Sequence, residues 1–222
     1  MNKTKKRRIN KIIMFISFEG GEAAGKTTLA RILSKKLTKD NYQVVLTKEP
    51  GGYKPFSFIR EKLLNPVMPP IDFKTEALLY AADRNEHLNN VILPALKKKN
   101  IVICDRYLDS SFVYQGYARQ LGKHYIAQIN DFALKHLPNI TFYLDLDPMM
   151  AKKRLSLFRS NKQNRLDLEK LEFYQKIREG YLELAQQENK RIIKIKANNS
   201  LSQLSSLIYQ KVKNLLCSTN HL

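Results

Sequence analysis

Short runs of apolar, mostly β-branched residues alternate along this chain with stretches whose apolar residues recur every three or four positions. Runs that are apolar on both faces are typical of buried strands in a parallel sheet, and the second spacing predicts amphipathic helices. The expected strands cover residues 12–18, 44–46, 101–104, 140–145 and 192–195. The expected helices cover 28–39, 56–64, 73–93 (with an internal break left open), a segment starting at 147–148, 167–187 and 201–216.

This alternation predicts an α/β fold of three layers, in which a five-stranded parallel sheet carries helices on both faces. Residues 12–216 are expected to form one domain, preceded by a disordered basic tail at 1–11 and followed by a tail at 217–222. Residues 154–169 lack a long apolar stripe and are rich in Lys, Arg and Asn, so we expect a mobile surface loop there.

The amino-acid composition narrows the classes of protein to which this chain can belong. Hydrophobic residues make up 43% and charged residues 27% of the 222 positions, which excludes wholesale disorder. Two cysteines, Cys104 and Cys217, are too few for a disulfide framework and favour a reducing compartment, so we expect a cytoplasmic protein. The apolar run at 12–16 is too short to span a bilayer, so no membrane association is expected. Met14 stays open as an alternative start to Met1.

The net charge of +19 comes from 39 Lys and Arg against 20 Asp and Glu. Such a field favours anionic partners, which include nucleotides, nucleic acid and acidic membrane surfaces. A solvated, lysine-rich surface explains the same charge equally well. Composition alone does not separate these interpretations.

One motif is far more specific than the charge. Residues 20–27 match G-x-x-x-x-G-K-[ST], with an expected strand before and a helix after. In such a loop, glycines let backbone N–H groups surround a phosphate, and the following helix directs its positive end at it. The predicted ATP-binding residues are Gly20, Gly21, Glu22, Ala23, Ala24, Gly25, Lys26, Thr27 and Thr28.

The sequence around this loop favours a small kinase over other nucleotide-binding classes. A GTPase needs an N-K-x-D string, and residues 161–164 lack the Asp. The third strand ends in Asp105-Arg106, an acid followed by a base, where motor and helicase types carry paired acids. The four histidines form no cluster, so they receive no ligand or base role.

Residues 105–116 read D-R-Y-L-D-S-S-F-V-Y-Q-G. Here the sequence resembles the thymidylate kinase family of P-loop nucleoside monophosphate kinases, as do the strings at 18–20, 47–52, 79–84 and 165–182. The resemblance covers about residues 13–216. It implies transfer of the γ-phosphate of ATP to dTMP, giving dTDP for dTTP synthesis, with Mg²⁺ as cofactor. It also implies a homodimer, with the 73–93 helix as a candidate contact.

The resemblance implies roles for the acceptor site. Tyr80, where the family usually has Phe, would stack on thymine. Arg84 would hydrogen-bond a thymine oxygen, and Tyr114 would lie against the sugar 2′ position. The remaining implied dTMP contacts are Ser110, Ser111 and Gln115 at the base, Glu22 at the 3′ hydroxyl, and Arg60 and Arg106 at the phosphate.

Catalytic roles follow from the same resemblance. Lys26 and Arg106 would neutralise phosphate charge, while Thr27 and Asp105 would hold Mg²⁺. The P-loop contains no Arg, so the chain looks like the bacterial type, which places a catalytic Arg in a lid over about 154–169. Arg159 and Arg165 are the candidates, and Arg154 is expected on the helix leading in. Lys48 and Tyr53 depart from the family pattern in the second loop.

Two alternatives remain for comparison. A kinase of another monophosphate or of a deoxynucleoside would turn over dCMP, UMP or thymidine at least as well as dTMP. A nucleotide-gated nucleic-acid-binding protein would use the basic residues of the 1–11 tail, and its affinity would fall steeply with salt. Basic composition carries no positional information whereas the motifs do, so nucleic-acid binding is not expected.

Overall fold

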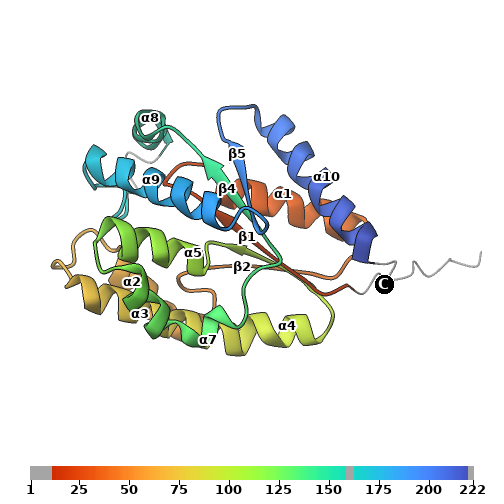
Figure 1. The fold of residues 1–222 in the computed structure, drawn as a ribbon, viewed down its shortest axis with the longest axis horizontal. Coiled ribbons are helices and arrows are strands. Elements are labelled where there is room, and N and C mark those ends of the chain that lie inside the picture. Colours follow the sequence, from red (N-terminus) through yellow and green to blue (C-terminus); the bar gives the residue numbers. More distant parts are fainter. Residues whose placement is uncertain (1–11, 159–162, 220–222) are drawn as a thin grey trace, which may run out of the picture.

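The computed structural model describes residues 12–158 and 163–219. A parallel sheet of five strands in the order β2-β3-β1-β4-β5 forms its centre (Figure 1). The expected five-stranded parallel sheet is therefore confirmed. The strands are β1 (Met14–Glu19), β2 (Val44–Lys48), β3 (Ile101–Asp105), β4 (Ile140–Asp145) and β5 (Ile192–Lys196).

Helices connect the strands and cover both faces of the sheet. The α-helices are α1 (Lys26–Lys39), α2 (Ser57–Leu64), α3 (Phe73–His87), α4 (Leu93–Lys97), α5 (Leu108–Ser111), α6 (Lys123–Ile129), α7 (Asp131–Leu134), α8 (Pro148–Phe158), α9 (Leu171–Gln187) and α10 (Leu201–Thr219). A 3₁₀ turn η1 (Lys54–Phe56) precedes α2, and π-helical turns η2 (Leu88–Ile92) and η3 (Phe112–Ala118) follow α3 and α5. In the described ranges, no helix is both long and apolar enough to cross a membrane.

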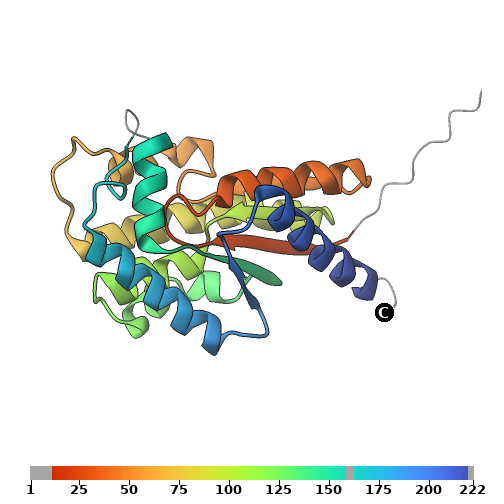
Figure 2. The same ribbon diagram turned by 90° about the horizontal axis from the view of Figure 1, so that it is seen from above.

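Alternate residues of β1 belong to different cores. Ile16 and Phe18 pack in the cluster that includes α1 and α10, which lie side by side in both ribbon views (Figures 1 and 2). Phe15 packs in a second cluster with η2 and α4. A strand buried on both faces is continuously apolar, which explains the unbroken run in the sequence.

Several boundaries differ from the sequence-based expectation. The first strand starts at Met14 and includes Glu19, while the last helix continues to Thr219, past the expected end at 216. The expected helix over 73–93 becomes α3, η2 and α4. Pro94 explains this break, because proline has no N–H to donate within a helix. The expected tail at 1–11 and residues 159–162 and 220–222 lie outside the described residues.

The segment expected to be a loop over 154–169 is partly helical. Helix α8 extends through Phe158, and a turn at 163–170 leads into α9, which begins at Leu171 and not at 167. Asn164 accounts for that turn, since its Oδ1 accepts from the N–H groups of Leu166 (2.9 Å) and Asp167 (3.2 Å). The Tyr174 hydroxyl also donates to the carbonyl oxygen of Leu166, at 3.1 Å. Hydrogen bonds within the turn at 163–170, and from Tyr174 on α9, thus hold this turn in place.

Candidate active site

A cavity of about 750 Å³ lies at the carboxyl ends of β1 and β3. Ligands of open parallel sheets bind at this edge, where strand order reverses. The cavity brings together both groups of residues singled out in the sequence. Those that line it are Glu22, Ala23, Ala24, Gly25, Lys26, Thr27, Thr28, Arg60, Tyr80, Arg84, Asp105, Arg106, Ser110, Ser111, Tyr114 and Gln115. Gly20 and Gly21, at the start of the loop, do not line the cavity.

The loop at 20–27 wraps tightly between β1 and α1. Gly20 has φ 138°, and a Cβ there would stand 2.6 Å from the carbonyl oxygen of Leu144, so only glycine fits. Lys26 is buried and donates from Nζ to the carbonyl oxygens of Gly20 (3.0 Å) and Gly21 (2.6 Å). Burial, followed by the nearby Arg106 charge, lowers the pKa of Lys26 to about 8.

Two oxygen groups suited to a hard cation meet beside the loop. The Thr27 hydroxyl donates to Oδ2 of Asp105, which ends β3. Hydroxyl and carboxylate oxygens are ligands that Mg²⁺ accepts, and Mg²⁺ usually completes its shell with water and substrate phosphate. No group of three or more His, Cys, Asp or Glu side chains suited to a metal occurs within the described ranges. The donor set therefore fits Mg²⁺ shared with a nucleotide.

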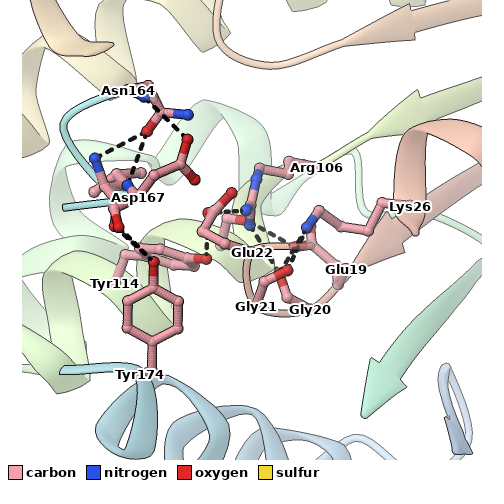
Figure 3. A network of polar contacts seen from close by, with 12 residues as sticks. Glu19, Gly20, Gly21, Glu22, Lys26, Arg106, Tyr114, Asn164, Asp167 and Tyr174 are labelled. Carbon is pink, nitrogen blue, oxygen red and sulfur yellow. Dashed lines mark hydrogen bonds and ion pairs between the residues drawn. The ribbon is translucent and has the colours of Figure 1, made fainter. Parts of the chain in front are cut away.

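Arg106 is the centre of a charged cluster next to the P-loop (Figure 3). Its guanidinium donates to Glu22, to the Gly20 carbonyl oxygen at 3.0 Å and to Ser110 Oγ at 3.3 Å. Tyr114 donates to the same Glu22 carboxylate at 3.0 Å. Arg106 also has φ 71°, a conformation that residues other than glycine rarely adopt. Such strain is often found where a side chain must point at a ligand.

A buried carboxylate, Glu19, supports this cluster from below. It accepts hydrogen bonds from the Tyr107 N–H (2.7 Å), the Ser110 hydroxyl (2.6 Å) and the Tyr181 hydroxyl (2.8 Å). Burial, with the nearby Asp109 charge, raises the pKa of Glu19 to about 7. Glu19 thus ties the end of β1 to the segment after β3.

Helix α3 holds the loop that follows β2. His87 Nδ1 lies 3.0 Å from Glu49 Oε1, and its Nε2 lies 2.6 Å from Thr47 Oγ1. Asp83 accepts from the Gly51 N–H, and burial raises the pKa of this aspartate to about 6. The sequence analysis assigned His87 no role, and the structure gives it one in positioning this loop.

Arg84 has contacts that the sequence did not suggest. Its guanidinium donates to Glu49 at 2.8 Å, to Asn130 at 2.7 Å and to the Tyr107 carbonyl oxygen at 3.4 Å, and the residue is 1% exposed. Glu49 is buried and needs a counter-charge, which explains this arrangement. Arg84 lines the cavity while also holding the loop after β2.

Arg60, expected at the acceptor phosphate, lies on α2 and lines the cavity. It donates to the Pro50 carbonyl oxygen at 2.8 Å, and burial lowers the pKa of its guanidinium. Tyr80, one turn before Arg84 on α3, lines the same cavity. The acceptor-site residues therefore share one cavity with the P-loop.

The candidate lid arginines have different positions. Arg165 donates to Glu76 and to the Leu63 carbonyl oxygen (2.9 Å), so it faces α2 and α3 and does not line the cavity. Arg154 lies on α8 as expected, and bonds the carbonyl oxygens of Ala23 (3.3 Å) and Ala197 (3.1 Å). Arg159 lies outside the described residues.

Sequence reasoning missed five buried side chains around the cavity. These are Glu19, Glu49, Glu76, Asp83 and His87. Three of them lie within the family-like strings at 18–20, 47–52 and 79–84, and Glu76 lies four residues before Tyr80 on one helix. The available signal was therefore partial: Glu49 follows Lys48 and Asp83 precedes Arg84, whereas Glu19 and Glu76 have no basic neighbour in the sequence.

A P-loop and a second, arginine-lined half in one cavity define a kinase that brings a nucleoside triphosphate and a phosphorylated acceptor together. The profile of the thymidylate kinase family matches residues 18–208. The chain belongs to the thymidylate kinase family.

Individual relatives agree with this assignment. Thymidylate kinase of Onion yellows phytoplasma (strain OY-M) is 53% identical over 201 residues, covering 90% of this chain and 97% of that protein. Thymidylate kinase of Acholeplasma laidlawii (strain PG-8A) is 45% identical over 199 residues, covering 90% and 98%. The crystal structure of thymidylate kinase from Ehrlichia chaffeensis has a TM-score of 0.74 and 32% identity, covering 91% of this chain and 99% of that one.

Proposed function

We propose that this chain transfers the γ-phosphate of ATP to dTMP, giving ADP and dTDP. The observation that carries the proposal is that Lys26, Arg106 and Tyr80 line one cavity. Membership of the thymidylate kinase family supports the same reaction. Holding donor and acceptor together in one cavity is the positioning that accounts for most of catalysis in phosphoryl transfer.

The P-loop half takes the donor. The N–H groups of residues 20–28 and the Lys26 ammonium hold the ATP phosphates. When ATP binds, the ammonium exchanges its hydrogen bonds to the carbonyl oxygens of Gly20 and Gly21 for hydrogen bonds to phosphate. Thr27 and Asp105 would hold Mg²⁺. The ion supplies positive charge to the β- and γ-phosphate oxygens.

The other half takes the acceptor. Arg60 and Arg106 bind its phosphate, because a guanidinium can form two parallel hydrogen bonds with it. Glu22 accepts from the sugar 3′ hydroxyl, and Tyr114, which bonds Glu22, closes the 2′ side. Tyr80 stacks on thymine, and the polar groups at its edge are Arg84, Ser110, Ser111 and Gln115.

Three further features belong to the proposal. Arg159 and Arg165 supply lid charge to the transferring phosphoryl group, which requires Arg165 to exchange its present partner Glu76. The chain forms a homodimer through α3, whose Phe73 and Leu78 are 44% and 49% exposed. It works in the cytoplasm, where its free thiols at Cys104 and Cys217 stay reduced.

A coupled ADP-release assay across dTMP, dUMP, dCMP, dGMP and thymidine tests the reaction. We expect dTMP to give the highest kcat/KM, with no turnover when Mg²⁺ is chelated. Equal or better turnover of dCMP or of unphosphorylated thymidine would contradict the proposal. Salt-dependent affinity for nucleic acid, lost on deleting residues 1–11, would favour the alternative class.

A further inference from the structure

The side chain of Gln115 has one end fixed by a buried carboxylate. Gln115 Nε2 donates to Glu76 Oε1 at 2.8 Å, and the two residues are 3% and 1% exposed. Gln115 lines the cavity, whereas Glu76 lies behind it on α3. The contact joins two elements, α3 and η3, beside the cavity that Tyr80 also lines.

The chemistry of this contact sets the orientation of the Gln115 amide. A carboxylate paired with a guanidinium only accepts hydrogen bonds, so the amide must turn its NH₂ group toward Glu76. Glu76 has such a partner in Arg165, and Arg119 Nε lies 3.9 Å from its Oε1. Gln115 Oε1 has no hydrogen-bond partner in the described part of the chain and is not among its fully buried atoms. This oxygen is the amide atom left for a ligand.

The two pyrimidine types differ at the position such an acceptor contacts. Thymine carries an N–H donor at N3, whereas cytosine N3 is an acceptor. A fixed carbonyl oxygen therefore pairs with thymine and leaves cytosine with two facing acceptors. Resting on the proposed function, we propose that Glu76 is a positioning residue: it fixes the Gln115 amide with its oxygen toward the base and thereby selects thymine over cytosine.

The same carboxylate also bonds the lid segment through Arg165. A change in Arg165 positioning would alter phosphoryl transfer equally for every acceptor, because the transferring group is the same. Loss of amide orientation changes the preference between bases instead. The ratio of kcat/KM for dTMP to that for dCMP therefore separates the proposed role from a general one.

The experiment compares this ratio in the unmodified protein, Glu76→Gln and Glu76→Asp. A neutral amide at 76 can present either end, so Gln115 can turn, and we expect the ratio to fall about tenfold or more in Glu76→Gln. Glu76→Asp keeps an acceptor and should retain more of the ratio. Glu86→Gln, the same change farther along α3, should leave it unchanged. A folded Glu76→Gln with the unmodified ratio would overturn the proposal, even if its overall rate falls.

A second measurement needs no variant. Calorimetry on the unmodified protein compares dTMP, dUMP and N3-methyl-dTMP, and we expect the N3-methyl compound to bind about tenfold more weakly than dTMP, while dUMP keeps the N3 contact. Equal binding of dTMP and N3-methyl-dTMP would overturn this proposal alone. Absence of dTMP turnover by the folded, unmodified protein would instead overturn the proposed function.

Discussion

The two ends of the cavity are built in different ways. At the proposed phosphate end, one continuous stretch, residues 22–28, lines the cavity and includes Lys26. At the proposed base end, the lining residues come from α3, η3 and the turn at 163–170, which hydrogen bonds to Glu76 join. The first is fixed by backbone geometry, and the second by the orientation of side chains from distant segments. Changes should therefore affect turnover most at the first end and substrate preference most at the second.

The largest expected effect is at the phosphate end. Lys26→Ala removes the point charge from the P-loop, and we expect kcat to fall about a thousandfold, since such charges act in a site that excludes water. Turnover of dTMP by the coupled assay measures this. Lys35→Ala is a matched control, because Lys35 is exposed on the same helix. A comparable loss in that control would show that α1, and not the charge, is responsible.

Arg106→Lys tests whether the charged cluster around Arg106 depends on the planar guanidinium or on positive charge alone. Lysine keeps the charge but loses the fork that bonds Glu22, Gly20 and Ser110 together. We expect kcat/KM for dTMP to fall about a hundredfold. Arg178→Lys, at an arginine on α9 outside the cavity, should have near-normal kinetics. Normal kinetics in Arg106→Lys would contradict the assigned role.

A change at the base end should act on binding more than on rate. Tyr80→Ala removes the stacking surface, and we expect KM for dTMP to rise about tenfold to a hundredfold with a smaller change in kcat. Steady-state kinetics over a wide dTMP range separate the two constants. Tyr80→Phe keeps the ring and should stay within about threefold of the unmodified KM. A fall in kcat with unchanged KM would place Tyr80 outside the acceptor site.

The change with the smallest expected effect on turnover is at Glu19, the buried carboxylate that contacts the Arg106 cluster. Glu19 has a folded-state pKa of about 7, above its ordinary value, so its contribution to stability is complete at acid pH and is lost as the pH rises to about 7. Between pH 5 and 8, the free energy of unfolding should fall by about 2 kcal/mol less in Glu19→Gln than in the unmodified protein. Urea unfolding across that range measures it, with Glu61→Gln on α2 as the exposed control. Identical pH profiles for Glu19→Gln and the unmodified protein would refute it.

The sequence predicts the strand, loop and helix around Lys26 well because their determinants are contiguous. The glycine spacing, the Lys and the flanking strand and helix all lie within residues 14–39, and local geometry follows directly from them. The strands were predicted for a similar reason, as buried parallel strands are continuously apolar. Pro94, with the π-helical turn before it, divides the predicted long helix, and that outcome depends on packing that a periodic pattern does not contain.

The base end shows what a single sequence does not encode locally. Gln115 was predicted from the family resemblance, but its partner Glu76 is 39 residues away along the chain, and Glu76 in turn pairs with Arg165, 89 residues farther on. Arg84 illustrates the difference, since its position gave no sign that Glu49 and Asn130 would engage it. A buried charge acquires its partner only once the fold brings the two segments together.

Arg154 connects helix α8 to two loops beside the cavity. It lies on α8 and donates hydrogen bonds to the carbonyl oxygens of Ala23, in the P-loop, and of Ala197, after β5. A shift of α8 therefore pulls on both loops at once. One guanidinium therefore couples the position of α8 to the shape of the P-loop and to the segment after β5.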